Sequence, residues 1–203
     1  MAATLAYEQS VFLNVPYDKT YEDKFVALVL ALVALGRIPR CVVEITEVGT
    51  GRLDRILRHL ESCRVSVHDL SYVNQPVRFN MPFELGLACG LQNYGSQKPS
   101  HIFLVLEAKP RRLDKTLSDL RGIDPLIHGG KPKGAISCIL DALGAGGHDP
   151  SADQVYALWE PLWQAAQRLK KRHGRTTLFH RGIFKDLVTV ATVLAEDARL
   201  IHP

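Results

Sequence analysis

The feature that most constrains the fold is a repeated alternation of short apolar segments with longer, helix-like ones. Apolar segments of strand length lie at 11–15, 41–45, 64–70, 101–107 and 125–128. Helical patterns follow them at 21–35, 53–62, 81–91, 113–120 and 134–143. Strands joined by helical crossovers pair in parallel, because the crossover returns the chain to the same edge of the sheet. We therefore predict an α/β fold with a doubly wound, five-stranded parallel sheet in the flavodoxin-like order 2-1-3-4-5.

Small and turn-forming residues at 144–150, GAGGHDP, interrupt this alternation. We therefore divide the chain into an α/β domain over 1–147 and a C-terminal helical extension over 148–203. Two helices are expected there, at 152–171 and 182–200, with apolar residues at helical spacing: Val155, Leu158, Trp159, Leu162, Ile183, Leu187, Val190 and Leu194. Because the α/β domain is complete without them, we expect this pair to form a homo-oligomer interface. The alternative is a hairpin packed on the sheet domain.

Composition indicates a soluble, cytoplasmic protein. With 203 residues and 46% hydrophobic content, the chain can bury one sizeable core. The longest apolar run, 25–35, is too short to span a bilayer, and no signal peptide is evident. Four cysteines without a CxxC spacing favour reduced thiols over zinc or disulfides, so no metal site is expected. The formal charge of +4 is mild and comes largely from a cluster at 168–175, which disfavours nucleic-acid binding.

Two carboxylates, Asp69 and Glu84, are the predicted catalytic pair. Asp69 ends the third strand, and Glu84 is expected in the first turn of the next helix, where the dipole favours an ionised carboxylate. Ligands of open parallel sheets bind beyond the strand ends and against helix N-termini, so both acids should face one cleft. One could then engage an anomeric carbon while the other handles a proton. The alternative for Glu84 is that it merely complements the helix dipole.

Details of this segment carry further expectations. Gly86 and Ala88 should keep the helix slim enough to approach the sheet closely. His68 points to the opposite face of its strand from Asp69, so we interpret it as structural.

The substrate-binding residues that we predict are Asn14, Tyr17, Ser71, Arg78, Asn80 and Phe83. Asn14 and Tyr17 follow the first strand and would contact a ribose or a base; the alternative is a turn that only redirects the chain. Arg78 would hold a phosphate, or else pair with one of the two acids. Glu44 or Glu47 could contact a ribose hydroxyl. No Walker or GxGxxG loop is present, which disfavours the classical phosphate-cradle enzymes.

Three segments carry a resemblance to a known group of proteins: VFLN at 11–14, VHDLS at 67–71 and FELGLA at 83–88. Together they resemble the nucleoside 2-deoxyribosyltransferase superfamily and the related TIR-like domains, over about residues 10–143. The resemblance implies that Glu84 is the catalytic glutamate and Asp69 a proton-handling or sugar-orienting aspartate. The chain departs from the transferases by a longer insertion between the two acids. It departs from typical TIR domains by lacking their Trp-Cys pair.

These features predict an N-glycosidase or N-glycosyltransferase that cleaves the base–sugar bond of a nucleotide, either NAD or a nucleoside monophosphate. NAD would be a substrate, and no cofactor is expected. For bacterial TIR-like proteins the resemblance also implies a part in antiviral defence. The alternative is a non-catalytic TIR-like module that binds a nucleotide or assembles with copies of itself in signalling.

Overall fold

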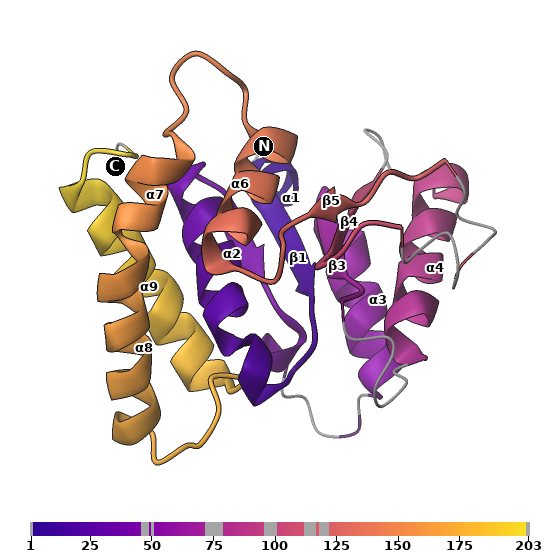
Figure 1. Cartoon of the computed structure of the whole chain (residues 1–203). Helices are drawn as coiled ribbons and strands as arrows, with labels where there is room; N and C mark the ends of the chain where they lie inside the picture. The colour runs from indigo at the N-terminus through magenta and orange to yellow at the C-terminus, as the bar shows by residue number, and fades with distance from the viewer. Residues whose placement is uncertain are drawn as a thin grey trace.

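The computed structural model describes residues 2–45, 49, 51–71, 79–95, 101–111, 117 and 122–201. In these ranges, five strands form one parallel sheet in the order β2-β1-β3-β4-β5 (Figure 1). The strands are β1 (Ser10–Asn14), β2 (Ile38–Arg40), β3 (Val65–Asp69), β4 (Ile102–Glu107) and β5 (Leu126–Ile127). The predicted fold class, an α/β fold with the flavodoxin-like strand order, is confirmed.

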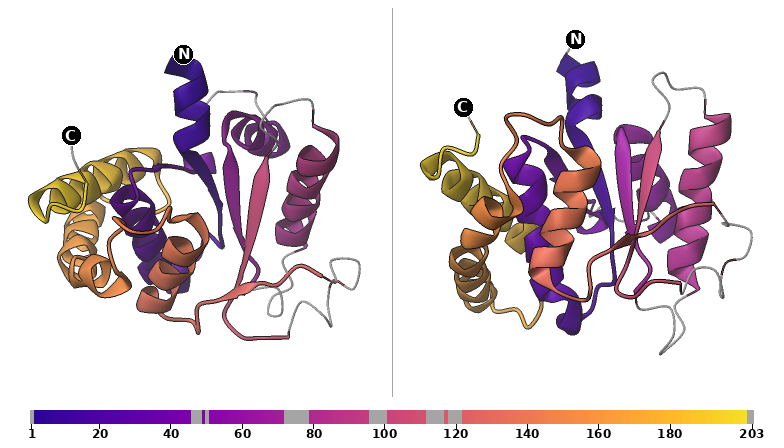
Figure 2. Two further views of the ribbon diagram at one scale, coloured as in Figure 1. Left: turned by 90° about the horizontal axis from the view of Figure 1, so that it is seen from above. Right: turned by 45° about the horizontal axis from the view of Figure 1, so that its top comes forward.

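Helices cover both faces of the sheet (Figure 2). One face carries α2 (Glu22–Ala34) and α6 (Pro132–Leu143), and the other carries α3 (Arg52–Ser62) and α4 (Asn80–Tyr94). The C-terminal helices α8 (Trp159–Arg172) and α9 (Arg181–Asp197) pack on α2, on its side away from the sheet. The remaining described helical elements are α1 (Ala2–Gln9), α7 (Ala152–Ala157) and two short 3-10 helices, η1 (Lys19–Tyr21) and η2 (Val42–Glu44).

Strand alternation decides which side chains face which helices. In β1, Val11 and Leu13 join the core under α2 and α6, whereas Phe12 packs with Ile56 and Leu60 of α3. Helix α2 lies between the sheet and the C-terminal helices, and its residues from Phe25 to Leu32 are all fully buried. This position explains why α2 is apolar on every side.

The C-terminal extension shares the core of the α/β domain. Val155, Leu162, Ile183 and Leu187 are fully buried in the same apolar cluster as β1 and α2. Their apolar stripe is therefore covered within the chain. This agrees with the alternative expectation, a helical hairpin packed on the sheet domain. Self-association through these helices stays a prediction.

A buried carboxylate ties the extension to α2. Glu22 is 1% exposed; its Oε2 lies 2.7 Å from Lys170 Nζ of α8, and its Oε1 accepts the backbone N–H of Leu178 at 2.8 Å. The Trp159 indole N–H donates to the carbonyl oxygen of Asp23 at 3.1 Å. These bonds fix the extension at one orientation on α2.

The predicted second strand at 41–45 is wrong. The strand is Ile38–Arg40, and the following residues form η2, because the Glu44 carboxylate accepts the Cys41 N–H at 2.7 Å and closes a turn. Pro39 is tolerated in β2 because this is an edge strand, with no partner on its outer side among the described residues.

Two other helical elements differ from the sequence expectations. The helix expected at 152–171 divides at Leu158 into α7 and α8, since Pro161 cannot donate the backbone bond that would continue one helix into the other. Helix α1 was not predicted. The helix expected at 113–120 falls, apart from Leu117, outside the described residues. Among the described helices, none combines the length and apolar character needed to cross a membrane.

The expectation that Gly86 allows close helix–sheet approach is wrong. Gly86 is exposed, and an added Cβ would meet no atom within 4 Å, whereas Ala88 is fully buried on the sheet side. Gly86→Ala should therefore stabilise the fold by about 0.5–1 kcal/mol, because alanine loses less backbone entropy in a helix. Urea denaturation measures this change.

Gly134→Ala is the matched control, since an added Cβ there would overlap the His128 carbonyl group. It should destabilise the fold by about 1–3 kcal/mol. A destabilising Gly86→Ala would show that this face of α4 is covered by something outside the described residues.

Candidate functional site

A hollow of about 430 Å³ opens at the carboxyl end of β1, lined by Val15, Tyr17, Arg52, Asn80 and Met81. The first two residues follow β1, Arg52 begins α3, and the last two belong to the first turn of α4. This is the edge at which open parallel sheets bind ligands, and the volume suits a small molecule.

Glu84 lies directly behind two residues that line this hollow. It is 2% exposed; its Oε1 lies 3.5 Å from Asn80 Nδ2 and 3.7 Å from an Arg52 guanidinium nitrogen. Its buried Oε2 accepts no hydrogen bond from the part of the chain that the structure describes. A buried carboxylate oxygen without a donor is costly, which marks Glu84 as a candidate for function rather than for stability.

Two expectations about Glu84 are corrected by the position of α4. The helix begins at Asn80, so Glu84 lies in its second turn, where the helix dipole is weaker. Burial raises the pKa of Glu84, and Arg52, Asn80 and Asn14 lower it by a smaller amount. Desolvation therefore outweighs the dipole, and the pKa lies above rather than below the ordinary value.

Asn14 ends β1 on the face of the sheet that α4 covers. It is 4% exposed, and its Nδ2 lies 2.9 Å from Nδ1 of His68, its register partner in β3. Burial lowers the pKa of His68 to about 3, so the imidazole is neutral. Asn14 thus contributes to the surroundings of Glu84 and does not project into solvent.

Tyr17 lines the hollow with its ring, while its hydroxyl is engaged elsewhere. The hydroxyl lies 3.0 Å from Cys41 Sγ and accepts the Val42 N–H at 3.2 Å. The ring stacks on Phe179 at a centroid distance of 4.7 Å, and the Arg52 guanidinium stands 5.9 Å from its centre. The ring therefore offers an apolar wall, and Arg52 a cation, to any ligand.

Asp69 belongs to a separate buried cluster on the α2 side of the sheet. It is fully buried, and its carboxylate accepts the Tyr21 hydroxyl, the Ser71 N–H at 2.8 Å and His128 Nε2 at 3.1 Å. The His128 Nδ1 accepts the Gly130 N–H at 3.0 Å, so the proton of the neutral ring resides on Nε2. His128 is then a donor toward Asp69 and Ser71, and the cluster is not arranged as a nucleophile–base pair.

The structure therefore does not bring the two predicted catalytic acids together. Asp69 follows His68 by one residue and faces the opposite side of β3, toward α2, whereas Glu84 approaches from α4. The two carboxylates share no described partner. Alternation along β3 places His68 and Asp69 on opposite faces of the sheet. Glu84 lies on the His68 face, so the same alternation separates it from Asp69.

The predicted binding residues are divided in the same way. Asn14 and Asn80 act on Glu84, and Tyr17 lines the hollow with Asn80. Ser71 instead bonds to His128 at 2.9 Å in the Asp69 cluster. Phe83 is 56% exposed and is not among the described residues that line the hollow. Arg78 and Glu47 lie outside the described residues. Glu44 is engaged by Arg40 and by the Cys41 N–H, so its carboxylate is a structural cap.

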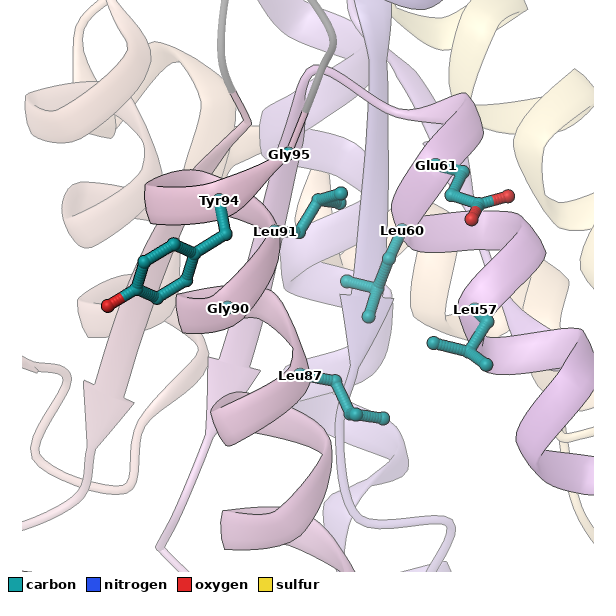
Figure 3. Close-up of a pocket in the computed structure, with 8 residues that line it drawn as sticks. All are labelled: Leu57, Leu60, Glu61, Leu87, Gly90, Leu91, Tyr94 and Gly95. Carbon is teal, nitrogen blue, oxygen red and sulfur yellow. The ribbon is translucent and has the colours of Figure 1, made fainter.

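A second hollow, of about 260 Å³, lies between α3 and α4 at their C-terminal ends (Figure 3). Leu87 and Leu91 of α4 point toward α3 across it, while the Tyr94 ring is turned away. Glu61 is the titratable carboxylate among its lining residues. The wall is mostly apolar, which suits packing better than chemistry.

Sequence reasoning missed Arg52 as a component of the site. Its position at the start of a helix is nevertheless a usual one for binding an anion. In the described residues, no group of three histidine, cysteine or acidic side chains could hold a metal ion. All four cysteines are free, and burial raises their pKa values, so they are thiols at neutral pH.

A comparison of the sequence with protein-family models and with curated proteins found no match. The strand order shows a fold of the flavodoxin-like type, and no family is shown for the chain.

Proposed function

We propose that this protein cleaves the base–sugar bond of a nucleotide at Glu84, as an N-glycosidase or N-glycosyltransferase, and that its preferred substrate carries a cationic base, as in NAD. The observation that supports this most is the buried Glu84 carboxyl, with an unbonded oxygen, directly behind an open hollow at the ligand-binding edge of the sheet. Once a ligand displaces the Arg52 and Asn80 side chains that stand in front of it, a carboxylate in this position can engage an anomeric carbon.

The preference for a cationic base follows from the separation of the two acids. Glycosidic cleavage of an ordinary nucleotide needs a second group to protonate the departing base. The nicotinamide of NAD leaves as a neutral molecule and needs no proton. With Asp69 bonded to Tyr21 and His128 on the other face, one carboxylate suffices only for such a leaving group.

The proposed steps balance with Glu84 alone. The Glu84 carboxylate bonds to the anomeric carbon as the carbon–nitrogen bond breaks, and the electron pair of that bond remains on the nicotinamide nitrogen. Water then attacks the same carbon, the glutamate leaves as a carboxylate, and the proton of the water passes to solvent. A sugar or base acceptor in place of water gives the transferase reaction.

The other residues of the hollow would bind the rest of the nucleotide. The Arg52 guanidinium, whose side chain is half exposed, is placed to hold a phosphate at the start of α3. The Tyr17 ring offers a flat apolar surface for a base or a ribose.

The test is incubation of the full chain with NAD and, separately, with a panel of nucleoside and deoxynucleoside monophosphates, followed by chromatography for free base. We expect nicotinamide release from NAD, and release from the monophosphates at least about a hundredfold slower because no described acid serves their bases. Equal release from both classes would contradict the preference for a cationic base.

A non-catalytic module is the second candidate, because the hollow could hold a nucleotide without reaction. Tight binding of a nucleotide with no base release from any substrate would support it against the enzyme. Assembly through copies of the chain, the other form of this candidate, is tested by the mass of the protein in solution with and without nucleotide.

A further inference from the structure

A line of buried polar side chains runs beneath α3 and α4 from Asn14 to the start of β3. The Asn14 Nδ2 is 2.9 Å from His68 Nδ1, and the His68 Nε2 is 2.8 Å from Ser66 Oγ. The Ser66 Oγ is 2.8 Å from His101 Nε2, and the His101 Nδ1 is 2.9 Å from the Cys63 carbonyl oxygen. None of the four side chains is more than 4% exposed, so the hydrogen bonds have no competition from bulk water.

One acceptor decides the direction of every bond in this line. The Cys63 carbonyl only accepts, so His101 carries its proton on Nδ1 and its Nε2 accepts from Ser66. The Ser66 oxygen is then free to accept, and it accepts from His68 Nε2–H, which leaves His68 Nδ1 as an acceptor. The reverse direction would set the lone pair of His101 Nδ1 against the Cys63 carbonyl.

The same logic orients the Asn14 amide. A side-chain amide has an oxygen and a nitrogen of nearly equal size, and its orientation follows from its hydrogen-bond partners. Because His68 Nδ1 is an acceptor, the Asn14 nitrogen must face it. That nitrogen has a second N–H. Burial raises the pKa of Glu84, and a hydrogen bond from the Asn14 side chain is among the smaller effects that lower it.

We infer that this line is a positioning device: the Cys63 carbonyl, acting through His101, Ser66 and His68, holds the Asn14 amide so that its donor side and not its oxygen serves the Glu84 carboxylate. If the line were broken, the amide could turn its oxygen toward Glu84 and disfavour the ionised nucleophile. The orientation stands on hydrogen-bond chemistry alone, and only its consequence for catalysis rests on the proposed function.

The orientation is tested by ¹⁵N NMR of the histidine side chains in the full chain. At neutral pH, His101 should be neutral with its proton on Nδ1, and His68 neutral with its proton on Nε2. Resonances are assigned from their loss in His68→Gln and His101→Gln. Either proton on the other nitrogen, or a doubly protonated ring, would overturn the inference whether or not the wild type releases a base.

A substitution at Asn14 tests the direct contact. The carboxylate of Asn14→Asp can only accept, so His68 Nδ1 should take up a proton and the ring should become doubly protonated at neutral pH. The titratable groups that the described contacts bring nearest to His68 are His101, whose pKa is lowered by burial, and Glu84 across Asn14. Asn80→Asp is the matched control: it adds the same charge beside Glu84 without contact to His68, and should leave His68 neutral.

The catalytic consequence is tested at Ser66, which touches neither Glu84 nor the hollow. Ser66→Ala should lower kcat for nicotinamide release about tenfold with KM unchanged, since it frees the Asn14 amide to turn. Ser66→Thr keeps the hydroxyl and should restore most of kcat. A Ser66→Ala enzyme with full kcat, or one whose loss is entirely in KM, would contradict a positioning role.

Discussion

Glu84→Gln should reduce nicotinamide release from NAD by about a thousandfold or more. Glutamine has almost the same shape as glutamate and keeps the packing against Arg52 and Asn80, but its amide cannot attack the anomeric carbon. The measurement is kcat by chromatography of free nicotinamide. Glu61 is an exposed carboxylate of α3, on the same face of the sheet as Glu84. Glu61→Gln is therefore the control and should keep full activity. Base release that survives in Glu84→Gln would remove Glu84 from the mechanism.

Glu84→Gln should lower activity but raise the stability of the fold at neutral pH. Because burial raises the pKa of Glu84, the folded state binds the proton more readily than the unfolded state. The stability that this proton contributes is complete below the unfolded pKa and is lost as pH rises through the folded pKa. Glutamine is neutral at every pH, so Glu84→Gln should unfold at higher urea concentration than wild type at neutral pH, with the difference vanishing in acid. Loss of both activity and stability would indicate misfolding instead.

Asp69→Ala should cost about 3–5 kcal/mol of unfolding free energy, the largest loss of stability that we expect from one substitution. Its carboxylate is fully buried and accepts bonds from Tyr21, Ser71 and His128, each of which would lose a buried acceptor. Urea denaturation followed by circular dichroism gives the change in free energy.

Asp153→Ala is the control for this substitution. Asp153 pairs with Lys133 on the surface at 2.5 Å and is 82% exposed, so its loss should change stability by less than about 1 kcal/mol. If Asp69→Ala keeps its stability and instead loses base release, the catalytic role first expected for Asp69 would be restored.

Much of the fold followed from local pattern. Strand and helix periods predicted β1, β3, β4 and β5 within a residue or two, because buried parallel strands and their crossover helices carry strong apolar signals. The second strand failed because β2 is short, lies at an edge and contains Pro39, so packing and neighbours rather than local preference decide its place. The segment at 42–44 has strand-forming valines, but the hydrogen bond from the Cys41 N–H to the Glu44 carboxylate closes it into a turn.

The candidate site was predicted in part. The sequence singled out Glu84 as the acidic residue near a helix start, and Asn14, Tyr17 and Asn80 among the substrate-binding residues of the same cleft. It missed Arg52, because nothing local shows that the start of α3 lies beside the start of α4. It also placed Asp69 in the same cleft, since two acids close in sequence at one sheet edge were taken to share a face.

The sequence by itself determined the strand order, the helices on both sides of the sheet and the edge at which a ligand can bind, because these follow from apolar periodicity and from the handedness of crossovers. Only the tertiary structure decided which side chains meet. Asp69 pairs with Tyr21 and His128, 48 and 59 residues away, on one face, while Glu84 meets Arg52 and Asn14 on the other. A strand presents neighbours to opposite faces, and what covers each face is set by helices distant in the chain.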